Sequence, residues 1–385
     1  MPTKLSSTFI SEERLQATRT VPDVNKGLEQ RRKEFVFQHG EYFDSYLATE
    51  PGREEFWSHS GEGLISYKRC GKCILVGGGV IAPDDHKATL LAEFLEFTKA
   101  RRYRVAFHNI GSHELVMFRN LGFEITKWGE EPVIDLGNCE WKGKAYEWVR
   151  RQSNYCLRQG VRAFEVPHCD LTPEQWKRTQ DEMLEVAAES LEHKPQRREM
   201  RFFEGHIGDH EVGLRRVFIA RSNDGMGRIE GFVVCTPMRG GAMWATELYR
   251  RRNDAIRGTM AFLFHTVQER LQDEGVQQLN LCLDPALRCG TKLPGDSALI
   301  RLGMSWGEAC LGYVFDVAGL RHFKSRFRPR YEDRFVCAYP KASVRSLLAF
   351  AQVSGLFDIS IRKLLKVSIQ RLRKAASRST LAKVH

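Results

Sequence analysis

The segment from Thr246 to Asp284 constrains the fold more than any other part of the chain. Apolar residues recur at helical spacing from Met260 to Leu271, and apolar and polar residues alternate from Leu279 to Asp284. The segment is therefore predicted to form a strand, a charged loop, a helix and a second strand. A unit of this kind indicates an α/β fold.

The loop between the first strand and the helix is unusually charged. Asp254 stands there among four arginines, which are Arg250, Arg251, Arg252 and Arg257. The N-terminus of a helix favours anionic ligands such as phosphate, because its backbone N–H groups and dipole point toward the ligand. In the alternative interpretation Asn253 or Asp254 is only an N-cap and the arginines form a solvated face. The density of charge favours an anion site.

Length and composition indicate a globular protein of two domains. The chain has 385 residues, of which 42% are apolar. No run approaches the roughly 20 apolar residues of a membrane-spanning helix, and the N-terminus lacks the apolar core of a signal peptide. We therefore expect the folded part of the protein to be cytoplasmic. Residues 341–385 hold ten basic residues against one acid, so this tail accounts for most of the net charge of +11.

Cysteine and histidine patterns do not predict a metal site. Among ten scattered cysteines, Cys70 and Cys73 alone form a CxxC pair, which lies between strand-like segments and suggests a hairpin turn. His193, His206 and His210 fall in a Gly-rich stretch that offers no helix to hold them. Free thiols and no bound metal are expected.

The chain divides into five segments by composition. They are an N-terminal helical extension (1–50), a first α/β domain (51–140), a basic connecting helix (141–163), a second α/β domain (164–340) and a basic tail (341–385). Arg119–Phe123 in the first domain and Arg301–Met304 in the second are similar, each placed after a strand and a short helix. This similarity suggests a degenerate duplication.

Individual elements are predicted from hydrophobic periodicity. The predicted strands are Gly63–Tyr67, Cys73–Val76, Arg104–His108, Val133–Leu136, Arg216–Arg221 and Ile229–Thr236. The predicted helices are Asn25–Phe37, Lys87–Arg101, Glu114–Leu121, Trp141–Gln159 and Pro173–Leu191.

Two basic segments are candidates for nucleic-acid contact. The helix at 141–159 carries Lys142, Lys144, Arg150, Arg151 and Arg158. In the segment 321–334, Arg326 and Arg328 stand near Phe323 and Phe327, which would anchor a short helix and leave Lys324 on its other side. Such residues suit contacts with RNA phosphates and bases. They equally suit a solvated helix and a packed edge helix.

The basic tail has the pattern of a helix that lies in an anionic membrane surface. One helical stripe holds Ile361, Leu364, Leu365, Ser368, Ile369, Leu372 and Ala376, and the basic residues Arg362, Lys363, Lys366, Arg373 and Lys374 lie elsewhere. A helix that docks on the body of the protein or on a second copy would show the same pattern.

Three stretches in order resemble one family. They are LYRRRNDAIRGTMAFLF, LRHFKSRFRPRYEDRF and LGFEITKWGEEPVIDLGNCEWKGKAYEWVRRQSN. They are similar to the C-terminal catalytic domain of the aminoacyl-tRNA-dependent phosphatidylglycerol synthases, the lysyl- and alanyl-phosphatidylglycerol transferases. The resemblance extends from about residue 55 to about residue 340.

The resemblance implies a fold and an activity. The fold would be two tandem acetyltransferase-like (GNAT) domains joined by the basic helix. The activity would be transfer of an amino acid from aminoacyl-tRNA to a lipid hydroxyl, with phosphatidylglycerol as acceptor and without metal or organic cofactor. Acetyltransferases of this fold hold CoA on a Gly-rich loop, and residues 253–259 depart from that pattern. An acyl-CoA-dependent acyltransferase and a non-catalytic module that binds tRNA or membranes are the alternatives.

The resemblance also implies roles for individual residues. Asp254 would orient or deprotonate the acceptor, Arg257 would bind the lipid phosphate together with Arg251 and Arg252, and Lys324 would contact the tRNA end or the oxyanion. The basic residues of 141–159, with Arg326 and Arg328, would bind tRNA. The synthases usually carry a multi-span membrane domain as well. Because no such segment is expected here, the tail would hold the protein at the inner face of the cell membrane. Another lipid and a non-lipid amine or hydroxyl are then alternatives to phosphatidylglycerol as the acceptor.

Overall fold

The computed structural model describes residues 27–192, 202–207 and 213–358. The first half of this part alternates strands and helices. Its elements are a helix at 27–39, β1 (Glu54–Trp57), β2 (Leu64–Cys70), β3 (Cys73–Val76), α2 (Asp84–Ala100), β4 (Arg104–Gly111), α3 (Leu115–Asn120) and β5 (Glu124–Asp135).

The second half follows after the connecting helix α4 (Glu147–Arg158). Its elements are β6 (Arg162–Val166), α5 (Pro173–Glu192), β7 (Arg216–Arg221), β8 (Ile229–Met238), β9 (Met243–Arg251), α6 (Thr259–Asp273), β10 (Gln278–Asn280), β11 (Asp284–Pro285), α7 (Ala298–Phe315), α8 (Val317–Ser325), β12 (Arg330–Tyr339) and α9 (Val344–Val353). The expected α/β fold class is confirmed.

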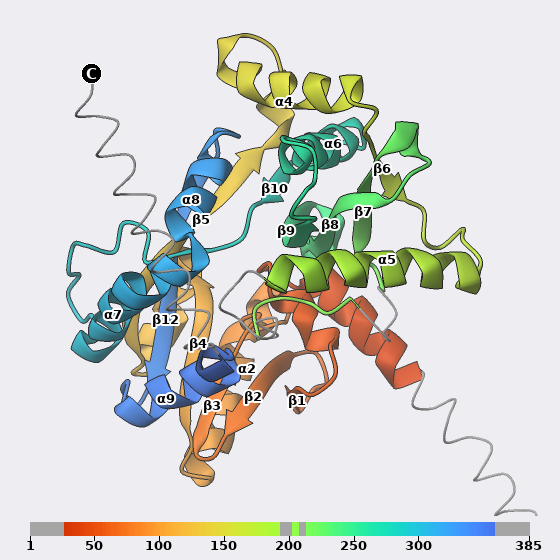
Figure 1. Cartoon of the computed structure of the whole chain (residues 1–385). Helices are drawn as coiled ribbons and strands as arrows, with labels where there is room; N and C mark the ends of the chain where they lie inside the picture. The colour runs from red at the N-terminus through yellow and green to blue at the C-terminus, as the bar shows by residue number, and fades with distance from the viewer. Residues whose placement is uncertain (1–26, 193–201, 208–212, 359–385) are drawn as a thin grey trace, which may run out of the picture.

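All of these strands belong to one mixed sheet. Its order is β1-β2-β3-β4-β12-β5-β10-β9-β8-β7-β6, and β11 pairs with β5 beside this path. Each half contains a parallel strand–helix–strand unit, which is β3-α2-β4 in the first half and β9-α6-β10 in the second. In Figure 1 the first unit lies in the lower part of the view and the second lies above it.

The two halves exchange their last strands. β5 ends the first half but pairs with β10 of the second, and β12 follows the second half but lies between β4 and β5. The long antiparallel pair of β12 and β5 forms the seam of the sheet. The hydrogen bonds of the backbone therefore tie both halves into one structure.

Helices cover both faces of the sheet, because alternate strand residues point to opposite sides. In the second half, Phe218 and Val233 pack with α4 and α6, whereas Val217 and Phe232 pack with α5. In the first half, α2 and α3 cover one face and α9 lies against the other. The predicted strands Cys73–Val76 and Arg216–Arg221 have these bounds in the structure.

The CxxC motif is a hairpin turn, as predicted. Cys70 and Cys73 are cross-strand partners between β2 and β3, and Gly71 between them has a φ of 58°. Glycine adopts this left-handed conformation without a steric penalty. Both cysteines are free thiols.

One prediction from the sequence is wrong, and others concern residues that the structure does not describe. Gly122 follows α3 in a turn with a φ of 81°, but Gly303 lies inside α7, so Arg301–Met304 does not follow a short helix. The predicted tail helix falls outside the described residues, as do His193 and His210. Within the described part, the helices lack the length and apolar character needed to cross a bilayer.

Candidate functional site

The charged loop between β9 and α6 passes close beneath the connecting helix α4. Helix α6 begins at Thr259, and its N-cap is Gly258 with a φ of 98°, not Asn253 or Asp254. A Cβ atom on Gly258 would lie 2.9 Å from Oε1 of Gln152 in α4. Glycine is thus required here both by the backbone conformation and by the close approach of α4.

Two of the four loop arginines form ion pairs that hold the loop against the rest of the second half. Arg250 pairs with Glu204 at 2.6 Å, and Arg252 pairs with Glu189 of α5 at 3.0 Å. The N–H of Asn253 also donates to Glu189, at 2.7 Å. Because Arg252 is neutralised in this way, it is a weaker candidate for lipid phosphate than the sequence suggests.

The other charged residues of the loop face solvent. Asp254 pairs with Arg228 at 2.8 Å and its side chain is 65% exposed. The hydrogen bond from Arg228 holds the pKa of Asp254 below its ordinary value, so Asp254 is an anion and a weak base. Arg251 and Arg257 are exposed, and neither forms an ion pair with any other described residue. Their charges are available to an anionic ligand.

Lys324 lies inside the protein, although the sequence pattern left it on the outer side of its helix. The side chain is 2% exposed, and its ammonium donates to the carbonyl oxygens of Cys282 (2.9 Å) and Leu283 (3.4 Å). It also pairs with Asp284 at 2.8 Å. Each of the three N–H bonds of the ammonium therefore has an acceptor. The predicted aromatic anchor is confirmed, since Phe327 belongs to the core of the second half.

Lys324 and the β9–α6 loop flank the point at which two parallel strands separate. β9 and β10 pair as far as Ala245 and Asn280. Beyond this point β9 continues along β8, whereas the chain after Asn280 follows β5, where Asp284 pairs with Glu130. Open sheets bind ligands at the carboxyl ends of parallel strands that part in this way. Asp254 and Lys324 contact different partners here, and no direct contact joins them.

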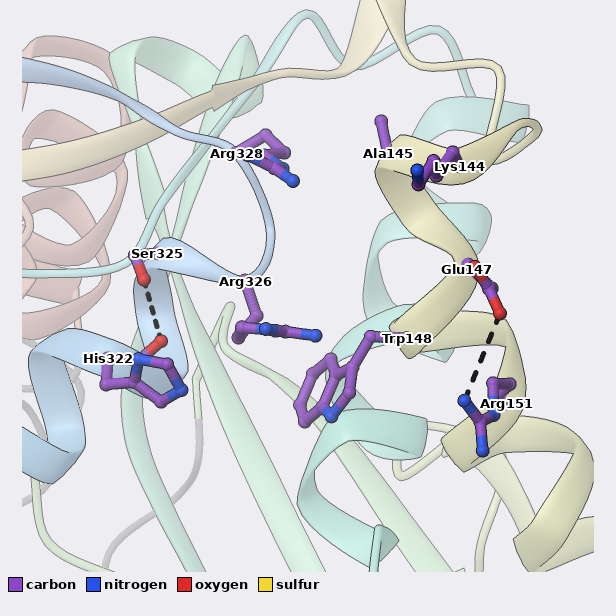
Figure 2. A pocket seen from close by; sticks show the side chains of 9 residues that line it. All are labelled: Lys144, Ala145, Glu147, Trp148, Arg151, His322, Ser325, Arg326 and Arg328. Atoms are coloured by element: carbon purple, nitrogen blue, oxygen red, sulfur yellow. Dashed lines mark hydrogen bonds and ion pairs between the residues drawn. The ribbon is translucent and has the colours of Figure 1, made fainter.

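A basic pocket of about 390 Å³ lies between α4 and the end of α8 (Figure 2). Four of the predicted tRNA-binding residues line it, namely Lys144, Arg151, Arg326 and Arg328. His322 also lines it, and Glu147 is the acidic residue among the lining groups. The guanidinium of Arg326 lies over the ring of Trp148, 4.9 Å from its centre.

The remaining predicted tRNA-binding residues lie outside this pocket. Arg150 donates to the carbonyl oxygens of Trp141 and Gly143, so it supports the turn that precedes α4. Lys142 and Arg158 are exposed at the two ends of the connecting segment.

Buried polar residues occupy the seam between the two halves. Glu131 of β5 accepts a hydrogen bond from Asn280 and pairs with Arg334 of β12, both at 2.7 Å. Asp44 accepts a hydrogen bond from Asn109 of β4 at 3.0 Å. Burial, and then the charge of Glu131, raise the pKa of Asp44 to about 7.

A third buried acid, Glu247, lies on β9. Glu247 pairs with Arg215 at 3.0 Å, and Arg215 also pairs with Glu50 at 2.8 Å. Burial raises the pKa of Glu247. Carboxyl groups with raised pKa values are common at functional sites, where they can act as an acid or a base.

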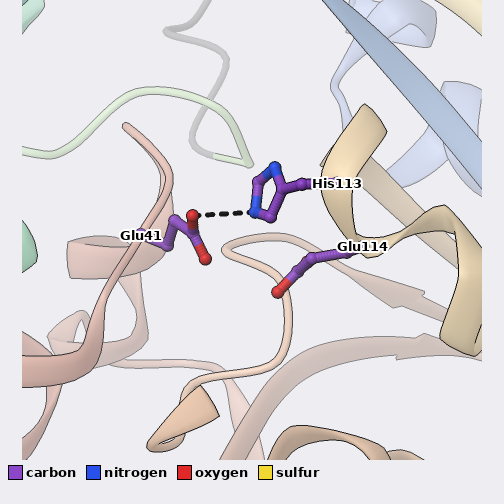
Figure 3. Close-up of side chains that lie close together, drawn as sticks. All are labelled: Glu41, His113 and Glu114. Atoms are coloured by element: carbon purple, nitrogen blue, oxygen red, sulfur yellow. Dashed lines mark ion pairs between the residues drawn. The ribbon is translucent and has the colours of Figure 1, made fainter.

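Glu41, His113 and Glu114 could in principle hold a metal ion (Figure 3). However, Lys87 pairs with both carboxylates, at 3.0 Å from Glu114, and Arg239 pairs with Glu41 at 2.6 Å. The charges of Glu114 and Glu41 raise the pKa of Lys87 despite its burial. The lysine ammonium already occupies the place between the carboxylates that a metal cation would need.

Comparison with known proteins places the chain in a family. The model of the C-terminal region of phosphatidylglycerol lysyltransferase matches residues 32–338. The chain belongs to this family. The lysyltransferase of Bacillus subtilis is 24% identical over 342 residues, which are 86% of this chain and 37% of that protein. A lysyltransferase of Staphylococcus xylosus is 21% identical, covering 77% of this chain and 34% of the relative. The chain spans little more than a third of the length of these relatives.

Solved structures show the same fold. The structure named L-PGS from Bacillus licheniformis has a TM-score of 0.71 and 22% identity, over 85% of this chain and 95% of that one. A C-terminal domain from Agrobacterium fabrum, described as part of a lysylphosphatidylglycerol synthetase, has a TM-score of 0.70 and 23% identity, over 84% and 95%.

Sequence reasoning missed the buried polar residues of this lysyltransferase-family chain. They are Asp44, Asn109, Glu131, Glu247 and Asn280, which are at most 6% exposed. Except for Glu131, which follows Glu130, each interrupts a run of mainly apolar residues, and a polar residue in such a run is the signal that could have found them. Its density of charge drew attention instead to the loop between β9 and α6, where Arg251, Asp254 and Arg257 are exposed.

Proposed function

We propose that this chain transfers an amino acid from aminoacyl-tRNA to a hydroxyl group of phosphatidylglycerol. Membership of the lysyltransferase family over residues 32–338 supports the reaction class. The observation that carries the proposal is the basic pocket, which gathers cations from two segments far apart in the sequence. A pocket with this charge and an aromatic wall suits the end of a nucleic acid.

The pocket offers both kinds of contact that a single-stranded RNA end needs. Lys144, Arg151 and Arg328 provide charges for phosphates, and Trp148 provides a ring on which a base can stack. Ser325 and Arg326 line the pocket beside Lys324, which points into the protein. An aminoacyl-tRNA end held in the pocket would therefore contact Ser325 and Arg326, the residues that directly follow the buried Lys324.

The chemistry needs alignment more than activation, because an aminoacyl ester is already reactive. The lipid hydroxyl oxygen attacks the ester carbonyl carbon, the bond from this carbon to the ribose oxygen breaks, and the hydroxyl proton ends on the ribose oxygen. Asp254 would orient the acceptor, since its lowered pKa makes it a weak base. Lys324 would stabilise the oxyanion by exchanging its 3.4 Å bond to the Leu283 carbonyl for one to the substrate.

The lipid would approach from the side of the charged loop. Arg251 and Arg257 are exposed cations without carboxylate partners among the described residues, and they suit a phosphodiester. We place the protein at the inner face of the membrane, where the basic tail would bind anionic lipids. Each basic residue near such a surface contributes about 1 kcal/mol.

A reconstituted transfer assay tests this function. The chain is mixed with vesicles that contain phosphatidylglycerol and with tRNA charged with radiolabelled lysine or alanine. We expect label in a ninhydrin-positive lipid, and ribonuclease treatment of the tRNA should abolish it. Absence of labelled lipid with both tRNAs would refute the function, as would lipid labelling that depends on acyl-CoA instead.

The same assay tests the proposed site. Asp254→Ala, Arg257→Ala and Lys324→Ala should each slow the transfer, while Arg178→Ala on the exposed face of α5 serves as the control. Wild-type rates in all three variants would show that the site is assigned to the wrong residues.

A further inference from the structure

The outer surface of helices α7 and α9 carries large apolar side chains. Leu302 and Trp306 of α7 are 66% and 62% exposed, and Val344 and Leu348 of α9 are 62% and 54% exposed. We call these four side chains the α7–α9 face. Single exposed apolar residues are ordinary, but a group of large ones on neighbouring elements marks a surface for interaction.

The two helices present this face as one surface. A Cβ atom on Gly303 of α7 would lie 3.5 Å from the side chain of Leu347 of α9, so the helices contact each other there. The two face residues of each helix are four positions apart, which places them on the same side of that helix. Figure 1 shows α7 and α9 next to each other at the lower left.

The inner sides of both helices are already buried. Ile300 and Met304 of α7 and Ala349 and Phe350 of α9 belong to one apolar cluster on the sheet. The core therefore does not need the residues of the α7–α9 face. Helices that cover a sheet usually turn charged or polar residues outward. Helix α2 on the other face of the same sheet follows this rule, since it exposes Asp84, Asp85, Glu96 and Lys99.

Basic residues border the α7–α9 face. Helix α9 has no acidic residue in its sequence, and Lys341 and Arg345 are exposed before and within it. Arg104 donates to the carbonyl oxygen of Lys341 at 3.2 Å, so a third cation lies at this border. Glu308 of α7 pairs with Arg321 of α8 at 3.2 Å, which neutralises an acid of this region.

We propose that the α7–α9 face inserts into the anionic surface of a phospholipid bilayer, with Lys341 and Arg345 against the lipid phosphates. Leucine and tryptophan side chains bordered by lysine and arginine are the combination that binds a membrane interface. This inference rests on the proposed function for the source of the surface, because the acceptor lipid of that reaction lies in a membrane.

Charge favours a bilayer over two other occupants of the face. A second copy of the chain would bring two positive borders together. Residues 359–385 hold eight basic residues and no acidic one, so this segment of the chain would also meet a border of its own sign. Anionic headgroups attract the border and the segment alike, and like charges in contact are unfavourable.

A membrane at this face would leave the basic pocket accessible. Helix α4, which forms one wall of the pocket, lies at the top of the molecule in Figure 1, whereas α9 lies near the bottom. A nucleic acid could therefore enter the pocket while the α7–α9 face is in contact with lipid.

Tryptophan fluorescence of the whole chain tests the insertion. The vesicles contain phosphatidylglycerol and phosphatidylcholine in equal parts, and their acyl chains carry bromine, which quenches only tryptophans that reach the acyl chains. We expect quenching of the wild type and a clearly smaller loss of fluorescence in Trp306→Phe, which keeps an apolar ring. Equal quenching of the two proteins, or none in either, would overturn the proposal.

Co-sedimentation with unbrominated vesicles of the same lipids locates the binding surface. Leu302→Gln/Leu348→Gln should weaken binding at least tenfold, because two leucine side chains no longer enter the bilayer. Val116→Gln is the matched control, since Val116 is 60% exposed on α3 at the opposite face of the sheet. Thermal unfolding verifies that the variants fold. Normal binding by a folded double variant would refute the role of this face.

The charge of the vesicle tests the border. Vesicles of phosphatidylcholine alone should bind the wild type at least tenfold more weakly, because they lack the anionic headgroups that Lys341 and Arg345 would meet. Equal binding to both kinds of vesicle would show that the surface is not specific for anionic lipid.

Iodide quenching without vesicles tests the other occupants. The difference between the wild type and Trp306→Phe reports whether aqueous iodide reaches Trp306, as a free face requires. Protection of Trp306 in a monomer would show that residues 359–385 cover the face, and protection in a dimer would show that a second copy does. Either result would overturn the proposal, and size-exclusion chromatography distinguishes them.

These outcomes are independent of the transfer assay, because vesicle binding requires no tRNA. If the wild type forms aminoacyl lipid but the double variant binds vesicles normally, the α7–α9 face is wrong and the proposed function stands. If Trp306 enters the bilayer and no lipid product forms, the face stands and the function fails.

Discussion

Lys324 and Asp284 form a buried ion pair whose side chains are 2% and 1% exposed. Such a pair contributes little net stability, because desolvation of both charges offsets their attraction. The loss of one partner is costly, since the other charge is left buried and uncompensated. Lys324 therefore has a structural role that is separate from its proposed role in transfer.

This pair leads to a prediction about stability. Lys324→Ala should lower the free energy of unfolding by about 3–5 kcal/mol, because Asp284 loses its counter-ion. The double variant Lys324→Ala/Asp284→Ala should be less destabilised than the sum of the single variants. Urea denaturation of the four proteins measures both effects, and strict additivity would argue against a coupled pair.

Asp44 gives the stability of the protein a pH dependence. Its pKa is about 7 in the folded protein and its ordinary value is 3.8, so the folded state binds the proton more tightly than the unfolded state between these values. The free energy of unfolding should therefore fall as the pH rises from about 4 to about 7. Glu131 adds to this effect, whereas Arg53, Asn109 and the Gly78 backbone oppose it.

The test compares Asp44→Asn with the wild type by thermal unfolding. Because asparagine does not titrate, the variant should lose the part of the pH dependence that Asp44 contributes. It should gain stability relative to the wild type on going from pH 5 to pH 8. An identical pH profile for the two proteins would contradict the assignment.

At the scale of elements, α4 and the residues that follow α8 bring cations to one pocket, although Arg151 and Arg326 lie 175 positions apart in the chain. Each helix is fixed by its buried face. Val149 and Cys156 of α4 pack on the second half, as does Phe323 of α8. The polar faces of the two helices point toward the pocket, where Arg326 stacks on Trp148.

Salt dependence of tRNA binding tests this pocket. Arg151→Ala and Arg328→Ala should weaken binding and lower the slope of log affinity against log salt concentration by about one each, since each removes a phosphate contact. Trp148→Ala should cost about 1–3 kcal/mol of binding with little change in slope. Filter binding at several salt concentrations provides both quantities. The pocket would be excluded if Arg178→Ala on α5 had the same effect.

At the scale of the whole molecule, the exchange of β5 and β12 makes the two halves depend on each other. β12 pairs with β4 on one side and β5 on the other, and β5 pairs with β10. Neither half can complete its part of the sheet without a strand from the other. The buried polar residues of the seam depend on the same exchange, since Glu131 lies on β5 and Arg334 on β12.

The exchange predicts a single cooperative unfolding transition. Phe335→Ala removes a buried ring from β12 and should lower the free energy of unfolding by about 3–5 kcal/mol. Hydrogen exchange should speed up in β4 and in β5 together, because β12 joins them. Faster exchange in β4 alone, or two separate unfolding transitions, would show that the halves are independent.

The sequence by itself determined what depends on neighbours along the chain. Hydrophobic periodicity predicted α6, α5 and the strand Cys73–Val76, because helices and strands repeat every 3.6 and 2 residues. The spacing of the CxxC pair predicted its turn, and three motifs predicted the family.

Only the tertiary structure decided which strands are exchanged, which arginines are neutralised by distant acids and which polar residues are buried at the seam. Arg252 illustrates the reason, since its partners on α5 lie about sixty residues away and no local pattern links them. Pairing across the sheet brings such residues together, and a pairing of distant strands leaves no period in the sequence from which it could be predicted.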